Sequence, residues 1–114
     1  MKIRTIILCS VAAMMTGCAG EFNRVIKSSD YDYRYEYAKQ CFAEGKFGRA
    51  EILLQDLITL KKGTDEAEEA LYMLAMSQYM NHDFESAAAT FRKYFSSYPK
   101  GFYAEQAMVY VGQS

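Results

Sequence analysis

Apolar residues recur every three or four positions from residue 31 onward, which is the spacing of one face of a helix. The clearest stripes are Phe47, Ala50, Leu54, Leu57 and Ile58, and later Phe84, Ala87, Phe91, Tyr94 and Phe95. No alternating strand pattern is present in this part of the sequence. We therefore expect an all-α fold.

Turn residues divide this pattern into five predicted helices. The first runs over about 31–44 and ends at Gly45, because glycine favours a helix C-terminus. The second begins near Phe47 and closes at 61–64, and the third continues to about Met80. The fourth runs from about 84 to 98, where Pro99 disfavours further helix. The fifth is expected to start near Gly101.

The chain repeats itself at an offset of 37 residues. The segment 67–75 (AEEALYMLA) returns as 104–112 (AEQAMVYVG), and Phe47, Ala50 and Leu54 correspond to Phe84, Ala87 and Phe91. A fixed offset of this size indicates stacked structural repeats. We expect an α-solenoid with hairpins over 31–63 and 64–100, and an incomplete third repeat over 101–114. Such arrays present binding surfaces.

The N-terminus has the pattern of a secretory signal. Residues 1–4 are basic, an apolar run covers 5–15, and Gly17 precedes Cys18. The run is too short to span a membrane as a helix. We predict a signal peptide at 1–17 and a tether at 18–30. The alternative is cleavage near Gly17 or Ala19 and release of a soluble secreted protein.

Charge and cysteine content exclude several partner classes. Without residues 1–17 the chain has 11 basic and 14 acidic residues, a net charge of −3. No basic stripe remains, so nucleic acid is not an expected partner. Cys9 leaves with the signal, and Cys41 is expected to be a packed, unreactive thiol. An internal disulfide is not expected.

Nothing in the sequence predicts an enzyme, a cofactor or a metal site. His82 is the one histidine and has no cluster of further ligands near it in the sequence. The segment 45–48 lacks the lysine–hydroxyl end of a phosphate loop. Glu66, Glu68 and Glu69 lie in the first turn of a predicted helix, where its dipole favours acidic residues.

The repeat residues resemble the tetratricopeptide family. The resemblance rests on small and apolar positions, which are Ala38, Gly45, Phe47, Ala50 and Leu54, and then Leu71, Leu74, Ala75, Phe84, Ala87, Phe91 and Pro99. The family repeat is about 34 residues long, so the offset of 37 implies extra residues near 61–65 and around Pro99.

A narrower resemblance covers residues 18–114. Met15–Cys18 resembles a bacterial lipobox, which implies lipidation of Cys18. With the Tyr-rich segment 31–38, the segment 62–75 and the turn 98–104, the chain is similar to the BamD family in its Bacteroides-type form. These are lipoproteins of the outer-membrane β-barrel assembly machinery. The resemblance implies an anchor at the periplasmic face of the outer membrane, with BamA, other subunits and unfolded β-barrel proteins as partners.

The sequence covers fewer repeats than that family. BamD proteins have about five repeats, so we expect this chain to correspond to the N-terminal portion. Two other readings stay open. The Tyr98-Pro99 turn also resembles CpoB, a Tol-associated cell-division coordinator. SusD-like glycan-binding lipoproteins are built on the same repeat.

A peptide-binding groove is the candidate site. The first helix of each tetratricopeptide repeat lines the concave side, where this chain has Tyr35, Lys39, Phe42, Tyr72, Met76 and Tyr79. Aromatic and methionine side chains suit an extended peptide, because they offer a large contact area and methionine adapts its shape. Lys39 is expected to meet a terminal carboxylate. The alternative is that these side chains only fill space between helices.

Overall fold

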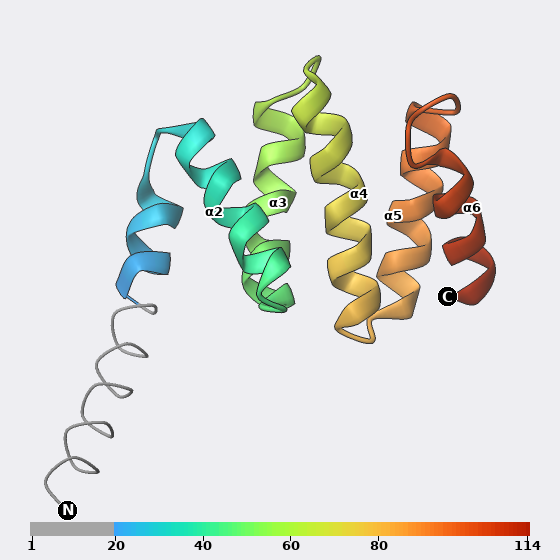
Figure 1. The fold of residues 1–114 in the computed structure, drawn as a ribbon, viewed down its shortest axis with the longest axis horizontal. Helices are drawn as coiled ribbons and strands as arrows, with labels where there is room; N and C mark the ends of the chain where they lie inside the picture. Colours follow the sequence, from blue (N-terminus) through green and yellow to red (C-terminus); the bar gives the residue numbers. More distant parts are fainter. Residues whose placement is uncertain (1–19) are drawn as a thin grey trace, which may run out of the picture.

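The structure, a computed structural model, describes residues 20–114 (Figure 1). All regular secondary structure in that range is helical. The labelled helices are α2 (Tyr31–Ala43), α3 (Phe47–Leu60), α4 (Asp65–Met80), α5 (Phe84–Ser97) and α6 (Ala104–Gln113). A further helical segment, 20–27, precedes α2. The expectation of an all-α chain is confirmed for these residues.

Consecutive helices pack side by side and alternate in direction, so they form a row rather than a closed bundle (Figure 1). The principal extents are 58 × 32 × 20 Å. Two hairpins, α2–α3 and α4–α5, are followed by α6. Each hairpin covers the apolar stripe of its neighbour, which is the arrangement that a fixed offset in the sequence favours.

The turns of the two hairpins use the same backbone conformation. Gly45 has φ of 77°, and His82, exactly one offset later, has φ of 62°. Gly63 closes α3 with φ of 89°. Positive φ carries no penalty for glycine but is unfavourable for histidine. Asp30 and Asp83 cap α2 and α5 by accepting hydrogen bonds from the backbone N–H groups of Tyr33 and Ser86.

Small residues at equivalent positions bring the helices together. Ala38 and Ala75, and likewise Ala50 and Ala87, are fully buried. Around them lie two clusters of buried side chains, one centred on α2, α3 and α4 and the other on α4, α5 and α6. Cys41 is buried in the first cluster, and burial raises the pKa of its thiol. Its predicted role as a packed residue is confirmed.

Two boundaries differ from expectation. Residues 20–27 of the expected tether are helical, and Val25 is fully buried while Phe22 and Ile26 pack on the first cluster. This part of the segment therefore belongs to the folded unit. The last helix begins at Ala104 rather than near Gly101, because residues 101–103 form a turn. The predicted signal, 1–17, and Cys18 lie outside the described residues.

Candidate partner-binding face

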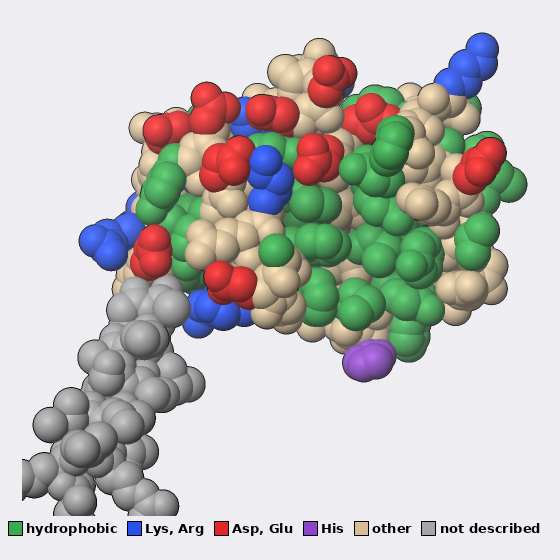
Figure 2. Space-filling view, in the orientation of Figure 1, with side chains coloured by type: hydrophobic (Ala, Val, Ile, Leu, Met, Phe, Trp, Pro, Cys, Tyr) green, Lys and Arg blue, Asp and Glu red, His purple; other side chains and the backbone are tan. Residues whose placement is uncertain are grey.

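One face of the molecule is formed by α2, α4 and α6, which lie toward the viewer in Figure 1. Figure 2 shows that its surface has two parts. Hydrophobic side chains gather between α4 and α6, whereas acidic and basic side chains gather over α2 and the adjoining end of α4. The predicted groove residues of α2 and α4 therefore lie in different chemical surroundings.

We call the first region the aromatic part and define it by Tyr72, Met76, Tyr79, Tyr103 and Tyr110. Tyr72 stacks on Tyr103 with ring centroids 4.1 Å apart and planes 6° apart. Tyr79 meets Tyr110 edge to face at 5.0 Å. All five side chains are half-buried. Such pairs add to the stability gained from burial and fix the ring orientations.

The Tyr72 hydroxyl of the aromatic part makes only a weak hydrogen bond within the protein. The Tyr72 hydroxyl donates a long contact of 3.5 Å to Oε1 of Gln106. Burial raises the pKa of Tyr72, and also that of Tyr103. Met76 packs on the second core cluster beside these rings. The region therefore offers ring faces, phenol hydroxyls and a thioether to a contacting group.

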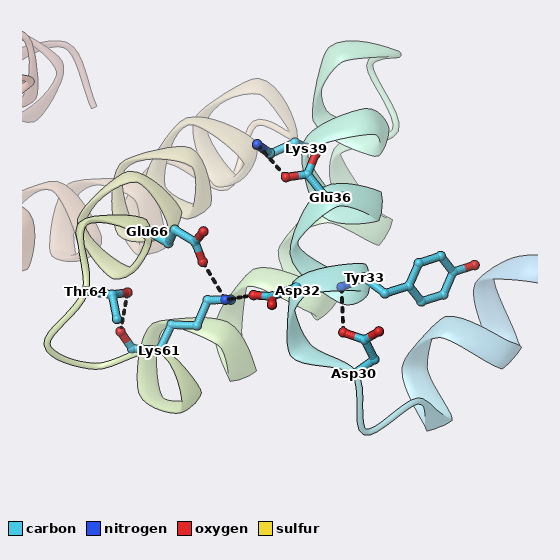
Figure 3. Close-up of polar contacts among 8 residues, drawn as sticks. All are labelled: Asp30, Asp32, Tyr33, Glu36, Lys39, Lys61, Thr64 and Glu66. Carbon is cyan, nitrogen blue, oxygen red and sulfur yellow. Dashed lines mark hydrogen bonds and ion pairs between the residues drawn. The ribbon is translucent and has the colours of Figure 1, made fainter.

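We call the second region the charged part and define it by Asp32, Glu36, Lys39, Lys61, Glu66 and Glu69. Figure 3 shows Lys61 reaching from the end of α3 to two carboxylates. Its Nζ lies 2.6 Å from Oδ1 of Asp32 and is also paired with Glu66. Lys39 Nζ lies 3.0 Å from Oε1 of Glu36. These hydrogen bonds raise the pKa of both lysines.

Tyr35 lies beneath the charged part and not on its surface. It is only 2 % exposed, and the Nζ atoms of Lys39 and Lys61 lie 4.7 and 5.6 Å from its ring centroid. Its hydroxyl makes no hydrogen bond of normal geometry within residues 20–114. Burial, and then the neighbouring Glu69 carboxylate, raise its pKa. The prediction that Tyr35 contacts a peptide is corrected, since almost none of its surface is accessible.

Phe42 also has a packing role. Its ring meets Phe47 edge to face at 5.6 Å and packs against the first core cluster. It joins α2 to the start of α3, away from the aromatic part. Of the six predicted groove residues, Lys39 therefore lies in the charged part, and Tyr72, Met76 and Tyr79 lie in the aromatic part.

Tyr103 and Tyr110 were missed by the sequence analysis. At the offset of 37 they correspond to Glu66 and Met73, which were not groove residues, so the repeat gave no signal for them. Tyr103 is held by its backbone N–H, which donates to the Tyr94 hydroxyl at 3.1 Å. That hydroxyl donates to Oε1 of Glu68 at 2.8 Å. Burial raises the pKa of Tyr94 to about 12.

Within residues 20–114, no three His, Cys, Asp or Glu side chains lie close enough together to hold a metal ion. No helix there is both long and apolar enough to cross a membrane. Comparison with known proteins gave no further guide, since neither a family model nor a curated protein matches the chain.

Proposed function

We propose that this chain is a tetratricopeptide-type scaffold that binds an extended segment of a partner protein on the face of α2, α4 and α6. The equivalent burial of Ala38 and Ala75 supports the repeat, as does the shared positive φ of Gly45 and His82. Repeat arrays of this kind use a surface built from successive helices for binding.

The aromatic part is the observation that carries this proposal. Met76, Tyr79 and Tyr110 are half-buried, so packing fixes their positions while part of each side chain remains accessible. Side chains ordered in advance lose little further entropy on binding. Aromatic side chains are also enriched among residues that dominate binding energy. We infer that this region takes an apolar or aromatic side chain of the partner segment.

The charged part favours a basic or neutral residue next to the apolar side chain of the partner segment. Its four carboxylates and two ammonium groups give a net charge of −2, and both lysines already have carboxylate partners. A terminal carboxylate at Lys39 would have to compete with Glu36. We therefore replace the expected carboxylate contact with a basic group of the partner near Glu69, which forms no salt bridge within residues 20–114.

The resemblance to the BamD family extends the proposal to the cell envelope. We propose that Cys18 carries a lipid and holds the scaffold at the periplasmic face of the outer membrane. Its partners would be BamA and unfolded β-barrel proteins. Strands of such barrels carry aromatic girdle residues, which suit the aromatic part. Substitution Cys18→Ser should move the protein from the membrane fraction to the soluble fraction, and retention in the membrane would contradict the anchor.

A binding titration tests the partner face itself. The probe is a fluorescent peptide from a β-barrel strand that contains an aromatic girdle residue and a neighbouring arginine. Tyr79→Ala should weaken binding about tenfold, a loss of about 1.4 kcal/mol, because we expect Tyr79 to be one of the few residues that carry most of the binding energy. Ile52→Glu on α3, where Ile52 is 52 % exposed, is the control and should leave affinity unchanged. If the Tyr79→Ala protein binds the peptide as tightly as the wild type and keeps its thermal melt, the proposal that this face binds the peptide is refuted.

A further inference from the structure

A groove of about 350 Å³ lies between the two hairpins, where the C-terminal ends of α3 and α5 meet the first half of α4. Its walls include Ile58 of α3, Leu71 of α4 and Tyr98 directly after α5. None of its lining residues belongs to the aromatic part or to the charged part. All three walls come from the two hairpins, so the groove is a surface of the repeat itself and is separate from the face proposed above.

The floor of this groove is apolar and its rim is basic. Ala67 and Leu71 are 3 % and 4 % exposed, and Ile58 packs on both core clusters. Lys62, which follows α3, and Lys93 of α5 also line the groove, and both are exposed. Neither lysine forms a salt bridge within residues 20–114. The groove therefore presents two ammonium groups beside an apolar surface.

The equivalent positions of the first hairpin hold an ion pair. Nη2 of Arg34 on α2 donates to Oδ2 of Asp56 on α3 at 3.0 Å. At the offset of 37, these two residues correspond to Leu71 and Lys93. Leucine takes the place of the guanidinium and lysine takes the place of the carboxylate, so the second hairpin cannot form this pair. Lys93 is left with an ammonium group at a position where the first hairpin has a neutralised carboxylate.

The carboxylates on either side of Ala67 already have partners. Glu66 pairs with Lys61, and Oε1 of Glu68 accepts a hydrogen bond from the Tyr94 hydroxyl at 2.8 Å. Neither carboxylate can neutralise the rim of the groove without giving up its present contact. The counter-charge for the two lysines of the groove therefore has to come from another molecule.

We propose that this groove binds an acidic segment of a partner protein, in which an aspartate or glutamate lies next to an apolar residue. The carboxylate would lie between Lys62 and Lys93, near the hydroxyls of Thr59 and Ser97, which also line the groove. Hydrogen bonds from an ammonium group to a carboxylate are stronger than those between neutral groups. The adjacent apolar side chain would cover Leu71. This occupant differs in charge from the basic or neutral segment expected on the α2–α4–α6 face.

The size and chemistry of the groove favour a peptide over a free anion or a lipid. Ligand sites have volumes of about 300–1,000 Å³, and this groove, at about 350 Å³, is at the small end of that range. It has room for one or two side chains. Inorganic phosphate has no apolar part to cover the floor, and the acyl chains of an anionic lipid would extend well beyond it.

A matched pair of short peptides tests the site. The first contains glutamate–leucine–glutamate between glycines, and the second has glutamine in place of both glutamates. Each is acetylated, amidated and labelled with an uncharged dye. Fluorescence anisotropy with the purified chain should saturate for the acidic peptide only. Lys93→Asp, which puts the residue type of Asp56 at the equivalent place, should weaken binding at least about tenfold, because like charges then face each other. Lys27→Asp, at an exposed lysine of the segment 20–27, changes the net charge equally and should leave affinity nearly unchanged.

Four results would overturn the proposal. These are equal affinity for the two peptides, binding that Lys93→Asp does not weaken, an equal loss of affinity in Lys27→Asp, and binding to phosphatidylglycerol vesicles in place of the acidic peptide. Retained thermal melts show that the variants are folded, and Lys93→Arg should keep the affinity because it keeps the charge. Tyr79→Ala should weaken the strand peptide and leave the acidic peptide unaffected. The peptide-binding face and the groove can therefore fail independently.

Discussion

The contact between α2 and α4 and the contact between α4 and α6 occupy equivalent places in the repeat but have different chemistry. At the offset of 37, Tyr35 corresponds to Tyr72, Glu66 to Tyr103, and Glu69 to Gln106. Tyr35 is enclosed beneath lysines and carboxylates. Tyr72 stacks on a second tyrosine.

The comparison separates the features that the two hairpins share from those in which they differ. The buried alanines and the turn conformation are the same in both hairpins. The residues between successive hairpins change from charged to aromatic. Charged contacts near the surface are weakened by salt, whereas burial of aromatic surface is not screened. The two contacts should therefore respond differently to mutation, pH and ionic strength.

The largest expected effect comes from Gly101, whose equivalent 37 residues earlier is Thr64, at the start of α4. A Cβ at Gly101 would lie 2.6 Å from the Tyr94 hydroxyl and would also collide with the Glu68 carboxylate. Gly101→Thr should lower the free energy of unfolding by about 2–3 kcal/mol, as overpacking does. Urea denaturation measures the loss. The exposed counterpart, Thr64→Gly, should change stability by less than about 1 kcal/mol, and similar losses in both variants would refute the difference.

The two most deeply buried phenols should make the fold sensitive to alkali. The pKa of Tyr94 is raised to about 12 from an ordinary value of 10, and that of Tyr35 is raised as well. The folded state therefore holds these protons more tightly than the unfolded state. Stability from Tyr94 should be complete below pH 10 and lost as the pH rises from 10 to 12. Thermal melts across this pH range should show that the melting temperature falls more steeply for the wild type than for Tyr35→Phe.

Removal of the phenol hydroxyl should change stability differently at Tyr35 and at Tyr72 when measured at neutral pH. Tyr35→Phe eliminates a buried hydroxyl without a hydrogen bond of normal geometry and should stabilise the protein by about 1 kcal/mol. Tyr72→Phe loses only the 3.5 Å contact with Gln106 and should change stability by less than about 0.5 kcal/mol. Chemical denaturation of both variants measures the difference. A loss of stability in Tyr35→Phe would mean that its hydroxyl is well bonded.

A substitution in the turn of the second hairpin should stabilise the protein. His82→Gly relieves the positive φ of 62° and should raise stability by about 0.5–1 kcal/mol, although the edge contact of His82 with Phe84 is lost. The reverse change in the first hairpin, Gly45→Ala, should lower stability by about 1 kcal/mol. Thermal melts of both variants give the comparison. Stability changes of the same sign would contradict the equivalence of the turns.

Ionic strength should have the smallest effect. The Asp32 and Glu66 side chains are 86 % and 45 % exposed, so their pairs with Lys61 are screened by salt. Lys61→Met should cost less than about 1 kcal/mol at low salt and less still in 1 M NaCl. Tyr103→Leu in the aromatic part should show no such salt dependence. Chemical denaturation of both variants at low salt and in 1 M NaCl measures the difference.

Helix positions could be predicted from the sequence, whereas the roles of individual side chains could not. Spacing and turn residues placed the starts and ends of α2, α3, α4 and α5 within about two residues. The start of α6 was misplaced because residues 101–103 form a turn, in which the backbone N–H of Tyr103 donates to the Tyr94 hydroxyl. Helical periodicity put Tyr35 and Tyr72 in one row, but it could not show that lysines cover one of them. Only the packing between hairpins decides that.

The central claim is that the aromatic part of the α2–α4–α6 face binds a partner segment. The most direct test is to map chemical-shift changes in the labelled protein as the unlabelled strand peptide is added. The largest changes should occur at Met76, Tyr79 and Tyr110, with smaller changes at Lys39 and Glu69. Changes confined to α3 and the outer side of α5, or no saturable changes at any residue, would contradict the claim.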